Sequence, residues 1–574
     1  MRQPSAISRR VSAAVVVLVV GSAVAACGPK ESGSDAGSGA SSAAPAKGGT
    51  LSVLNRAPQT NFDPARLYTS GGGAVPSLVF RTLTTRNREA GAAGAEVVPD
   101  LATDLGAPSE NATVWTYTLK DGLKYEDGTA ITSADVKYGI ERSFAAELSG
   151  GAPYLRDWLI GGADYEGPYK DKKGLASIAT PDDRTIVFHL NKPEGEFPYL
   201  ATQTQTTPVP QAKDTGATYE NHPVSSGPYK VVSNEGDGEH LVLERNPYWS
   251  EKTDSERKAY PDKIDVRSGL DPAVVNQRLS ASRGADAAAV TTDTNLGPAE
   301  LAEVTGDKAL AARVGEGHFG YTNYIAFNPK VKPFDNPKVR QAISYAVNRT
   351  SVINAAGGSS LAEPATTFLP EQKSFGYTAY DAFPSGATGD AAKAKELLKE
   401  AGYPNGLTVT LTHDNEKNFA TSPEVATAIQ EALKKAGITV ELKGLEDNAY
   451  SETAYNVKTE PGFFLAGWGA DWPSGGPFLG PVFDGRQIVE DGYNFNTGRL
   501  NDASVNKEID EINQLTDLAA AAARWGALDK KIGEQALTVP LFHPVYQRLY
   551  GADVKNVVIS DWTGVLDIAL VSVK

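Results

Sequence analysis

A mixed α/β fold is predicted by two local patterns and by the order in which they occur. The stretch VWTYTL at 114–119 has a large apolar residue at every second position, which is typical of a strand with one buried face. The stretch TSADVKYGIERSF at 132–144 places Val136, Ile140 and Phe144 four residues apart, on one side of a helix. Farther along the chain such helices and strands alternate, which indicates an α/β architecture.

Four further strands are predicted by the same alternation or by a short run of β-formers. RTIVFHL at 184–190 and HLVLER at 240–245 alternate apolar and polar residues. LTVTL at 407–411 and ITVEL at 438–442 each follow a predicted helix that ends in glycine. These strands lie far apart in the sequence, so the sheets they join must be built from distant segments.

Helices in the second half carry their own start signals. Asp271 is the expected cap and Pro272 the first residue of a helix that ends before Gly284. Asn336 and Pro337 repeat this arrangement, and the apolar residues that follow them share one helical face. Two more helices are expected over 390–402 and 422–437.

The N-terminus predicts export. Residues 1–26 have a basic head and then an uncharged, Val- and Ala-rich run, which is typical of a secretory signal peptide. The run is shorter than the ~20 residues that a membrane-spanning helix needs. VAAC at 24–27 resembles a bacterial lipobox, which implies that Cys27, the single cysteine, is lipidated after cleavage. The alternative is a buried cysteine in a plain exported chain. Residues 27–47 are then the lipidated cysteine and a flexible Gly/Ser-type linker.

Composition argues against one class of partner. The chain carries 70 acidic and 55 basic residues, a net charge of −15, so no nucleic-acid partner is expected. With 22% charged and 41% hydrophobic residues it has the composition of a soluble globular protein with a large core. Its 23 tyrosines and 7 tryptophans can line a ligand site, although large aromatic residues more often lie in a core.

Several blocks of sequence, in order, resemble family 5 of the extracellular solute-binding proteins, the oligopeptide- and dipeptide-binding lipoproteins of ABC importers. The blocks are WTYTLKDGLKYEDGTAITSADVKYGIERSF, VSSGPYKV, ERNPYW, AFNPKVKPFDNPKVRQAISYAVNR, AKELLKEAGYPNGL and AGWGADWP. The resemblance runs from about residue 48 to the C-terminus. It implies a two-lobed periplasmic-binding-protein clamshell (type II, similar to cluster C) with an extra inserted domain.

The resemblance also implies a division of the chain. Lobe I is expected to be discontinuous, an inserted domain to sit on it, and lobe II to be continuous, with the chain crossing between lobes twice to form a hinge. The expected segments are 48–82, 222–312 and 539–574 for lobe I, 83–221 for the inserted domain and 313–538 for lobe II.

The function implied by the resemblance is binding and delivery without catalysis. The protein is expected to capture an oligopeptide by hinge closure and to pass it to the permease of an ABC transporter. It is expected to be a monomer, to need no cofactor or metal, and to stay at the outer face of the cell membrane through lipid on Cys27. Acyl chains hold a protein by burying CH₂ groups, and one chain alone binds only marginally.

Asp471 is the leading candidate for ligand contact. It follows the apolar run of 463–469, and the C-terminal end of a buried strand is where ligand crevices open in α/β sheets. A carboxylate in a dry cleft must be paired, because an unpaired charge there is unfavourable by several kcal/mol. In peptide-binding relatives the matching Asp takes the α-ammonium of the ligand. The alternative is that Asp471 caps the following turn.

The residues beside Asp471 complete the candidate site. The glycines would let an extended peptide lie against the backbone and exchange main-chain hydrogen bonds. The expected ligand-binding neighbours are Gly467, Trp468, Gly469 and Ala470. Some peptide binders carry a basic residue just before this stretch, where this chain has Leu465, so no partner for a ligand carboxylate can be assigned.

A second candidate segment is YTSGGGAVPSL at 68–78. By position it resembles the lobe I segment that faces ligand across the cleft, and Gly71, Gly72 and Gly73 permit close backbone approach. A surface loop is the equally weighted alternative.

Other function classes have less support. No GxSxG, HExxH or Walker A sequence occurs, so a surface hydrolase has no motif, although carboxylates could pair in space. GEGHFG at 315–320 matches GxGxxG, but a strand-like stretch follows where a helix is required. Oligosaccharide is the second ligand class, since Trp and Tyr can stack on sugar rings. Nickel and haem are disfavoured by one Met, one lipidated Cys and six scattered His. A structural cell-wall protein would have no closing cleft.

Overall fold

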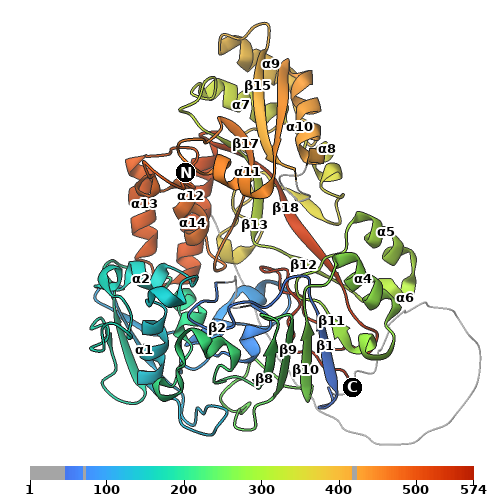
Figure 1. The fold of residues 1–574 in the computed structure, drawn as a ribbon. Helices are drawn as coiled ribbons and strands as arrows, with labels where there is room; N and C mark the ends of the chain where they lie inside the picture. Colours follow the sequence, from blue (N-terminus) through green and yellow to red (C-terminus); the bar gives the residue numbers. More distant parts are fainter. Residues whose placement is uncertain (1–44, 69–72, 416–422) are drawn as a thin grey trace, which may run out of the picture. The chain divides into compact units, whose positions relative to one another are not determined.

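Three large sheets and a two-stranded ribbon organise the part of the chain that the structure describes (Figure 1). The computed structural model describes residues 45–68, 73–415 and 423–574, so Cys27 and the predicted signal peptide lie outside it. Within these residues helices and strands alternate, and the predicted α/β class is confirmed. No helix among them is long and apolar enough to cross a membrane.

The five-stranded sheet has the order β11-β1-β10-β9-β8. β1 pairs in parallel with β10, from Thr50 opposite Lys263 to Leu54 opposite Arg267, and β9 and β8 continue the sheet antiparallel. The strands are β1 (Thr50–Leu54), β8 (Tyr229–Glu235), β9 (His240–Arg245), β10 (Lys263–Arg267) and β11 (Ala289–Val290). The helices that follow β10 and β11 are α4 (Pro272–Ala281), α5 (Pro298–Gly306) and α6 (Lys308–Ala311).

The four-stranded sheet is antiparallel throughout, with the order β4-β5-β7-β6. Its strands are β4 (Ala107–Ser109), β5 (Val114–Thr118), β6 (Ile178–Ala179) and β7 (Thr185–His189), and its helices α1 (Ser133–Arg142), α2 (Tyr154–Trp158) and α3 (Phe197–Leu200). The alternation that predicted β5 and β7 puts Trp115, Tyr117, Ile186 and Phe188 into one core. The ribbon of β2 (Thr84–Arg86) and β3 (Val97–Pro99) precedes this sheet in the sequence.

The seven-stranded sheet has the order β12-β18-β13-β17-β15-β16, with β14 paired to β18. Its strands are β12 (Val314–His318), β13 (Tyr321–Phe327), β14 (Ala362–Pro364), β15 (Leu407–Asp414), β16 (Ile438–Leu445), β17 (Phe463–Gly469) and β18 (Thr538–Leu549). GEGHFG lies largely in β12 and is followed by β13, so it does not have the strand–helix context of a dinucleotide-binding loop.

Both faces of this sheet are buried under helices. Ile325 and Phe327 of β13 point into one hydrophobic cluster, whereas Tyr324 and Ala326 point into another. The helices are α7 (Pro337–Ala346), α8 (Arg349–Ala355), α9 (Ala391–Glu400), α10 (Pro423–Lys435), α11 (Asp447–Ala454), α12 (Gly476–Phe483), α13 (Ala503–Asn513) and α14 (Leu518–Gly533). We refer to each sheet, together with the helices named with it above and the loops that join them, as the five-, four- or seven-stranded region.

The predicted helix caps are confirmed. The Asp271 side chain accepts a hydrogen bond from the Ala273 amide at 2.8 Å, and Asn336 accepts one from Lys338 at 3.0 Å. α4 ends before Gly284, as predicted, but the residue that takes the left-handed conformation after Ala281 is Ser282, with φ of 48°. Gly284 therefore lies beyond the helix without ending it.

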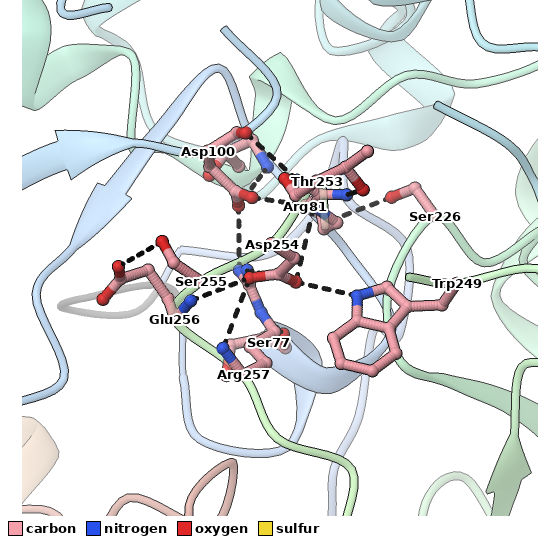
Figure 2. A network of polar contacts seen from close by, with 12 residues as sticks. Ser77, Arg81, Asp100, Ser226, Trp249, Thr253, Asp254, Ser255, Glu256 and Arg257 are labelled. Atoms are coloured by element: carbon pink, nitrogen blue, oxygen red, sulfur yellow. Dashed lines mark hydrogen bonds and ion pairs between the residues drawn. The ribbon is translucent and has the colours of Figure 1, made fainter. Parts of the chain in front are cut away.

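A buried ionic network fastens the five-stranded region to the segment that leads into the four-stranded region (Figure 2). Arg81 Nε lies 2.7 Å from Asp100 Oδ1, and Arg257 Nη2 lies 2.9 Å from Asp100 Oδ2. Arg257 also pairs with Asp254 at 3.1 Å, whose Oδ2 accepts the indole N–H of Trp249 at 2.9 Å. Burial raises the pKa of Asp254, but Arg257 and Arg81 outweigh it and hold that pKa well below its usual range. Each charged side chain of the network has a partner of opposite charge, so removal of one member would leave a buried charge without its partner.

Candidate functional site

Asp471 lies two residues past the end of β17, a central strand of the seven-stranded sheet. β17 runs antiparallel to β13 along its whole length, from Phe463 opposite Phe327 to Gly469 opposite Tyr321. The apolar first half of β17 is fully buried, and burial decreases toward Gly469. The strand therefore delivers the carboxylate to a half-buried position at its C-terminal end, as the sequence predicted.

Two tyrosines from distant segments donate to the Asp471 carboxylate. The Tyr68 hydroxyl donates to Oδ2 at 2.8 Å, and the hydroxyl of Tyr154, the first residue of α2, donates to the same oxygen. Burial raises the pKa of Asp471, and the hydrogen bonds from Tyr154 and Tyr68 lower it only in part. The carboxylate is thus oriented through one oxygen by neutral donors.

Among the residues that the structure describes, no cation pairs with Asp471. Its recorded partners are the two phenolic hydroxyls, and no backbone amide of the turn that follows donates to it. That turn closes through the Ser474 amide and the Trp472 carbonyl instead, at 2.7 Å. The side chain points to Tyr68 and Tyr154 rather than to its own backbone, so it does not cap this turn, and its contact with a ligand stays a prediction.

Trp472 follows a strand of the seven-stranded region, but its side chain packs in the core of the four-stranded region. Its side chain is 3% exposed and belongs to the same hydrophobic cluster as Trp115 and Phe188. The indole meets the ring of Tyr154 edge-on, with centroids 4.9 Å apart, and the ring of Trp158 at 6.0 Å. The residue after the candidate carboxylate is therefore fixed by aromatic packing on α2.

Glu196 binds Trp472 and Ser474, two residues of the turn that follows Asp471. Its carboxylate accepts the indole N–H of Trp472 at 2.7 Å, the hydroxyl of Ser474, and the indole N–H of Trp525 at 2.9 Å. Glu196 directly precedes α3 and is 4% exposed. Burial raises the pKa of this carboxyl, and the three donors partly offset that effect.

The predicted neighbours of Asp471 have partners of their own. The indole N–H of Trp468 donates to the Pro477 carbonyl at 3.0 Å, and its ring lies 5.0 Å from that of Phe495. Ala470 is buried. Gly467 and Gly469 lie under the ring of Tyr321, which occupies the space that a Cβ on either glycine would need.

The glycine-rich segment is only partly described. Gly71 and Gly72 lie outside the described residues, while Gly73 is half-buried with φ of 70°, a conformation that suits glycine. Tyr68, at the start of the segment, reaches Asp471, so this part of the chain does lie beside the candidate carboxylate. Whether the three glycines contact a ligand stays a prediction.

Sequence reasoning missed Tyr154 and Glu196 and did not single out Tyr68. Tyr154 reaches Asp471 across 317 positions of the chain. Glu196 reaches Trp472 across 276 positions and Ser474 across 278. No periodicity or local motif sets them apart from other tyrosines and glutamates. The one local signal was the run of turn-forming residues at 471–475, which predicts a loop but does not indicate which side chains pack against it.

A separate hollow lies between the ribbon and α14. It encloses about 570 Å³ and is lined by Val97, Leu105, Tyr199, Tyr377 and Leu518 among others. Its walls are mainly alanine, tyrosine and other apolar side chains, and Asp471 does not line it. Its charged lining residues, Glu96 and Lys373, are exposed to solvent, whereas Asp471 is half-buried, so the hollow is the weaker candidate for recognising a charged solute.

Comparison with known proteins gives a consistent result. The profile described as "Bacterial extracellular solute-binding proteins, family 5 Middle" matches residues 96–489. The glutathione-binding protein GsiB of Pectobacterium atrosepticum is 28% identical over 453 residues, covering 78% of this chain and 80% of that protein. GsiB of Escherichia coli O157:H7 is 26% identical over 455 residues, with the same coverage.

Solved structures agree in fold. The clavulanic acid biosynthesis oligopeptide binding protein 2 superposes with a TM-score of 0.84 at 35% identity, over 92% of this chain and 96% of that one. The unliganded murein tripeptide binding protein MppA gives a TM-score of 0.75 at 22% identity, over 92% and 98%. These likenesses confirm the two-lobed, type II periplasmic-binding-protein fold that the sequence resemblance implied.

Proposed function

Because the chain belongs to family 5 of the bacterial extracellular solute-binding proteins, which serve ABC importers and are not enzymes, we propose that it captures an oligopeptide and delivers it to a permease. Relatives with related ligands support the peptide class, since they include glutathione-binding proteins and oligopeptide-binding protein 2. Capture and release would involve binding and lobe closure, with no bond made or broken.

The observation that carries the proposal is the state of the Asp471 carboxylate. Tyr68 and Tyr154 both use Oδ2, and none of the described residues supplies a positive charge. A half-buried carboxylate with a raised pKa gains most from a cationic partner that also donates hydrogen bonds. The α-ammonium of a peptide is such a partner, and the hydroxyls of the two tyrosines would hold the carboxylate in place for it.

The remaining predicted contacts would recognise the first part of the peptide main chain and side chains. Trp468 and Phe495 give an aromatic surface near the end of β17, with Phe495 41% exposed. Gly467, Gly469 and Ala470 would present the strand backbone to the main chain of the peptide, and Gly71, Gly72 and Gly73 would face the peptide from the other lobe.

The proposal includes a location and a division into lobes. Lipidation of Cys27 would tether the protein at the outer face of the cell membrane, with residues 28–47 as linker. Lobe I (48–82, 222–312 and 539–574) would contain the five-stranded sheet, and the inserted domain (83–221) the four-stranded sheet. Lobe II (313–538) would contain β12 to β17 of the seven-stranded sheet, to which β18 is added by the chain as it passes into lobe I. Arg313, at the first proposed crossing, donates to the Tyr550 carbonyl at 2.7 Å, and β12 directly after it pairs with the end of β18.

Oligosaccharide is the second candidate ligand. The observation that favours it is the exposure of two aromatic side chains, Tyr493 at 46% and Phe495 at 41%, of which Phe495 lies next to the ring of Trp468. Aromatic faces of this kind can stack on sugar rings. A sugar would not need the Asp471 charge, so the effect of an Asp471 variant separates the two classes.

Thermal unfolding of the full chain with Cys27→Ser tests the proposal. Pools of di- to pentapeptides, the same pools N-acetylated, and a pool of oligosaccharides are added to wild type, Asp471→Asn and the exposed control Asp491→Asn. A ligand at 100 times its Kd should stabilise the protein by about 2.7 kcal/mol. We expect free-amine peptides to stabilise wild type and the control but not Asp471→Asn. Stabilisation by sugars alone would overturn the peptide proposal.

A further inference from the structure

Glu196 belongs to the four-stranded region, yet the three groups that donate hydrogen bonds to its carboxylate come from the seven-stranded region. Trp472 Nε1 lies 2.7 Å from Oε2, Trp525 Nε1 lies 2.9 Å from Oε1, and the Ser474 hydroxyl also donates to Oε1. No cation among the described residues pairs with it. The buried charge is therefore balanced by three dipoles that reach it only while the two regions are in contact.

Glycines on both sides of the contact between the four- and seven-stranded regions allow the two regions to approach closely. A Cβ on Gly195 would overlap the carbonyl oxygen of Leu515, and the Gly195 amide donates to the Asn513 carbonyl at 2.6 Å. A Cβ on Gly476 would lie 2.7 Å from Oε2 of Glu196. Gly195 thus lets its backbone approach Leu515, and Gly476 leaves room for the Glu196 carboxylate. This observation is independent of the hydrogen bonds.

The same contact continues to the candidate ligand carboxylate. Trp472 is bonded to Glu196 and packs edge-on against Tyr154, with ring centroids 4.9 Å apart. Tyr154 in turn donates its hydroxyl to Asp471, the residue before Trp472. Trp472, Tyr154 and Asp471 therefore contact one another in a closed set, and Glu196 is bonded to this set through the indole of Trp472. A shift of the indole would move both the Asp471 carboxylate and its donor Tyr154.

We propose that Glu196 is a positioning residue that ties the contact between the four- and seven-stranded regions to the orientation of Asp471 toward a ligand ammonium. It touches no ligand itself and acts through Trp472. When the regions separate, Glu196 loses its three donors and the Asp471 turn loses its anchor. The inference rests on the proposed function for its ligand, but the coupling it describes exists without one.

Glu196→Gln isolates the role of the carboxylate. Glutamine replaces one carboxylate oxygen by an NH₂ group, which would face an N–H or O–H donor from Trp472, Trp525 or Ser474. Trp472→Phe removes the donor but keeps an aromatic ring against Tyr154. Glu194→Gln is the matched control, because Glu194 is also buried and two positions away but pairs with Lys192 at 2.8 Å.

The first readout is the ratio of Kd values for an N-acetylated peptide and the same peptide with a free amine, measured by calorimetry on the full chain with Cys27→Ser. Glu196→Gln and Trp472→Phe should each reduce this ratio about tenfold, which corresponds to about 1.4 kcal/mol, while Glu194→Gln keeps the wild-type ratio. A purely structural role would weaken both peptides alike and leave the ratio unchanged, and that result would overturn the proposal.

The second readout needs no ligand. Spin labels at Lys172→Cys and Lys434→Cys, both exposed, report the separation of the four- and seven-stranded regions in the Cys27→Ser background. Glu196→Ala should shift the ligand-free distance distribution to longer values, whereas Glu194→Gln should not. If no peptide binds wild type, the proposed function fails and this distribution alone decides the coupling. An unchanged distribution in a folded Glu196→Ala protein would refute it.

Discussion

The Tyr68 hydroxyl donates a hydrogen bond to Oδ2 of Asp471 at 2.8 Å, across 403 positions of the chain. Tyr154 donates to the same oxygen from the four-stranded region. Three segments that share no local pattern thus meet at one carboxylate, and each supplies a group whose removal has a predictable effect.

Tyr154→Phe should weaken binding of free-amine peptides by about tenfold or more. Hydrogen bonds to charged groups contribute about 1.5–3 kcal/mol, and loss of the hydroxyl leaves the Asp471 carboxylate less well oriented. Calorimetric titration of wild type and variant measures the change. Tyr138→Phe is the control, since its hydroxyl donates to Asp214 at 2.8 Å and not to Asp471. Equal affinity of Tyr154→Phe and wild type would contradict the assigned role.

Peptide affinity should fall at acidic pH and do so at a higher pH than an ordinary aspartate would give. The ammonium binds the ionised carboxylate, and burial raises the pKa of Asp471. Affinity is therefore retained well above that pKa and decreases about tenfold per pH unit well below it. Titrations from pH 4 to 7.5 test this, and Asp471→Asn should show weak, nearly pH-independent binding. A flat wild-type profile would count against an ionic contact.

Asp63→Asn should destabilise the protein by about 3–5 kcal/mol. Asp63 accepts hydrogen bonds from both terminal nitrogens of the Arg142 guanidinium at 2.9 Å, and both side chains are fully buried. The variant leaves this buried charge with Asp214, at 3.1 Å, as its remaining ion-pair partner among the described residues. Urea unfolding measures the loss. The exposed pair of Lys170 and Glu166 is the comparison, and Glu166→Gln should change the free energy of unfolding little. A small effect at Asp63 would mean that water or Asp214 compensates Arg142.

Asp529→Asn should flatten part of the pH dependence of stability. Burial raises the pKa of Asp529 to about 7, well above its value in an unfolded chain. The folded state therefore holds a proton that the unfolded state has released, and stability falls by about 1.4 kcal/mol per pH unit from about pH 4 to 7.

The variant should lose that component, so its free energy of unfolding relative to wild type should rise across this window and level off above about pH 7. Urea unfolding at half-unit intervals of pH gives the difference, in which other titrating groups cancel. Asp553→Asn, at an exposed position, should run parallel to wild type. A parallel course for Asp529→Asn as well would show that this carboxyl is ionised in the folded protein.

Gly467→Ala should destabilise the protein by about 1–3 kcal/mol, because its Cβ would overlap the ring of Tyr321. Gly480 of α12 has open space where a Cβ would go, so Gly480→Ala should instead stabilise by about 0.5–1 kcal/mol. Thermal unfolding of the two variants compares a glycine required by packing with one that is not. Similar stabilities would show that Tyr321 moves aside freely.

Much of the fold was predictable because its signals are local. The alternation at 114–119 and 184–190 gave β5 and β7, and caps at Asp271 and Asn336 gave the starts of α4 and α7. The residue that takes the left-handed conformation after α4 was not predictable, since it is a serine where a glycine is expected. Such exceptions arise where tertiary contacts outweigh the local preference of the backbone.

The sequence by itself determined the α/β class, the family resemblance and the place of Asp471 at the end of a buried strand, because periodicity, caps and ordered blocks are properties of neighbouring residues. Only the tertiary structure decided what surrounds that carboxylate. Tyr68, Tyr154 and Glu196 become its neighbours through the packing of three regions, and the burial of Trp472 in the core of another region fixes their geometry. Side-chain proximity across hundreds of positions depends on how sheets and helices pack, and no local pattern records it.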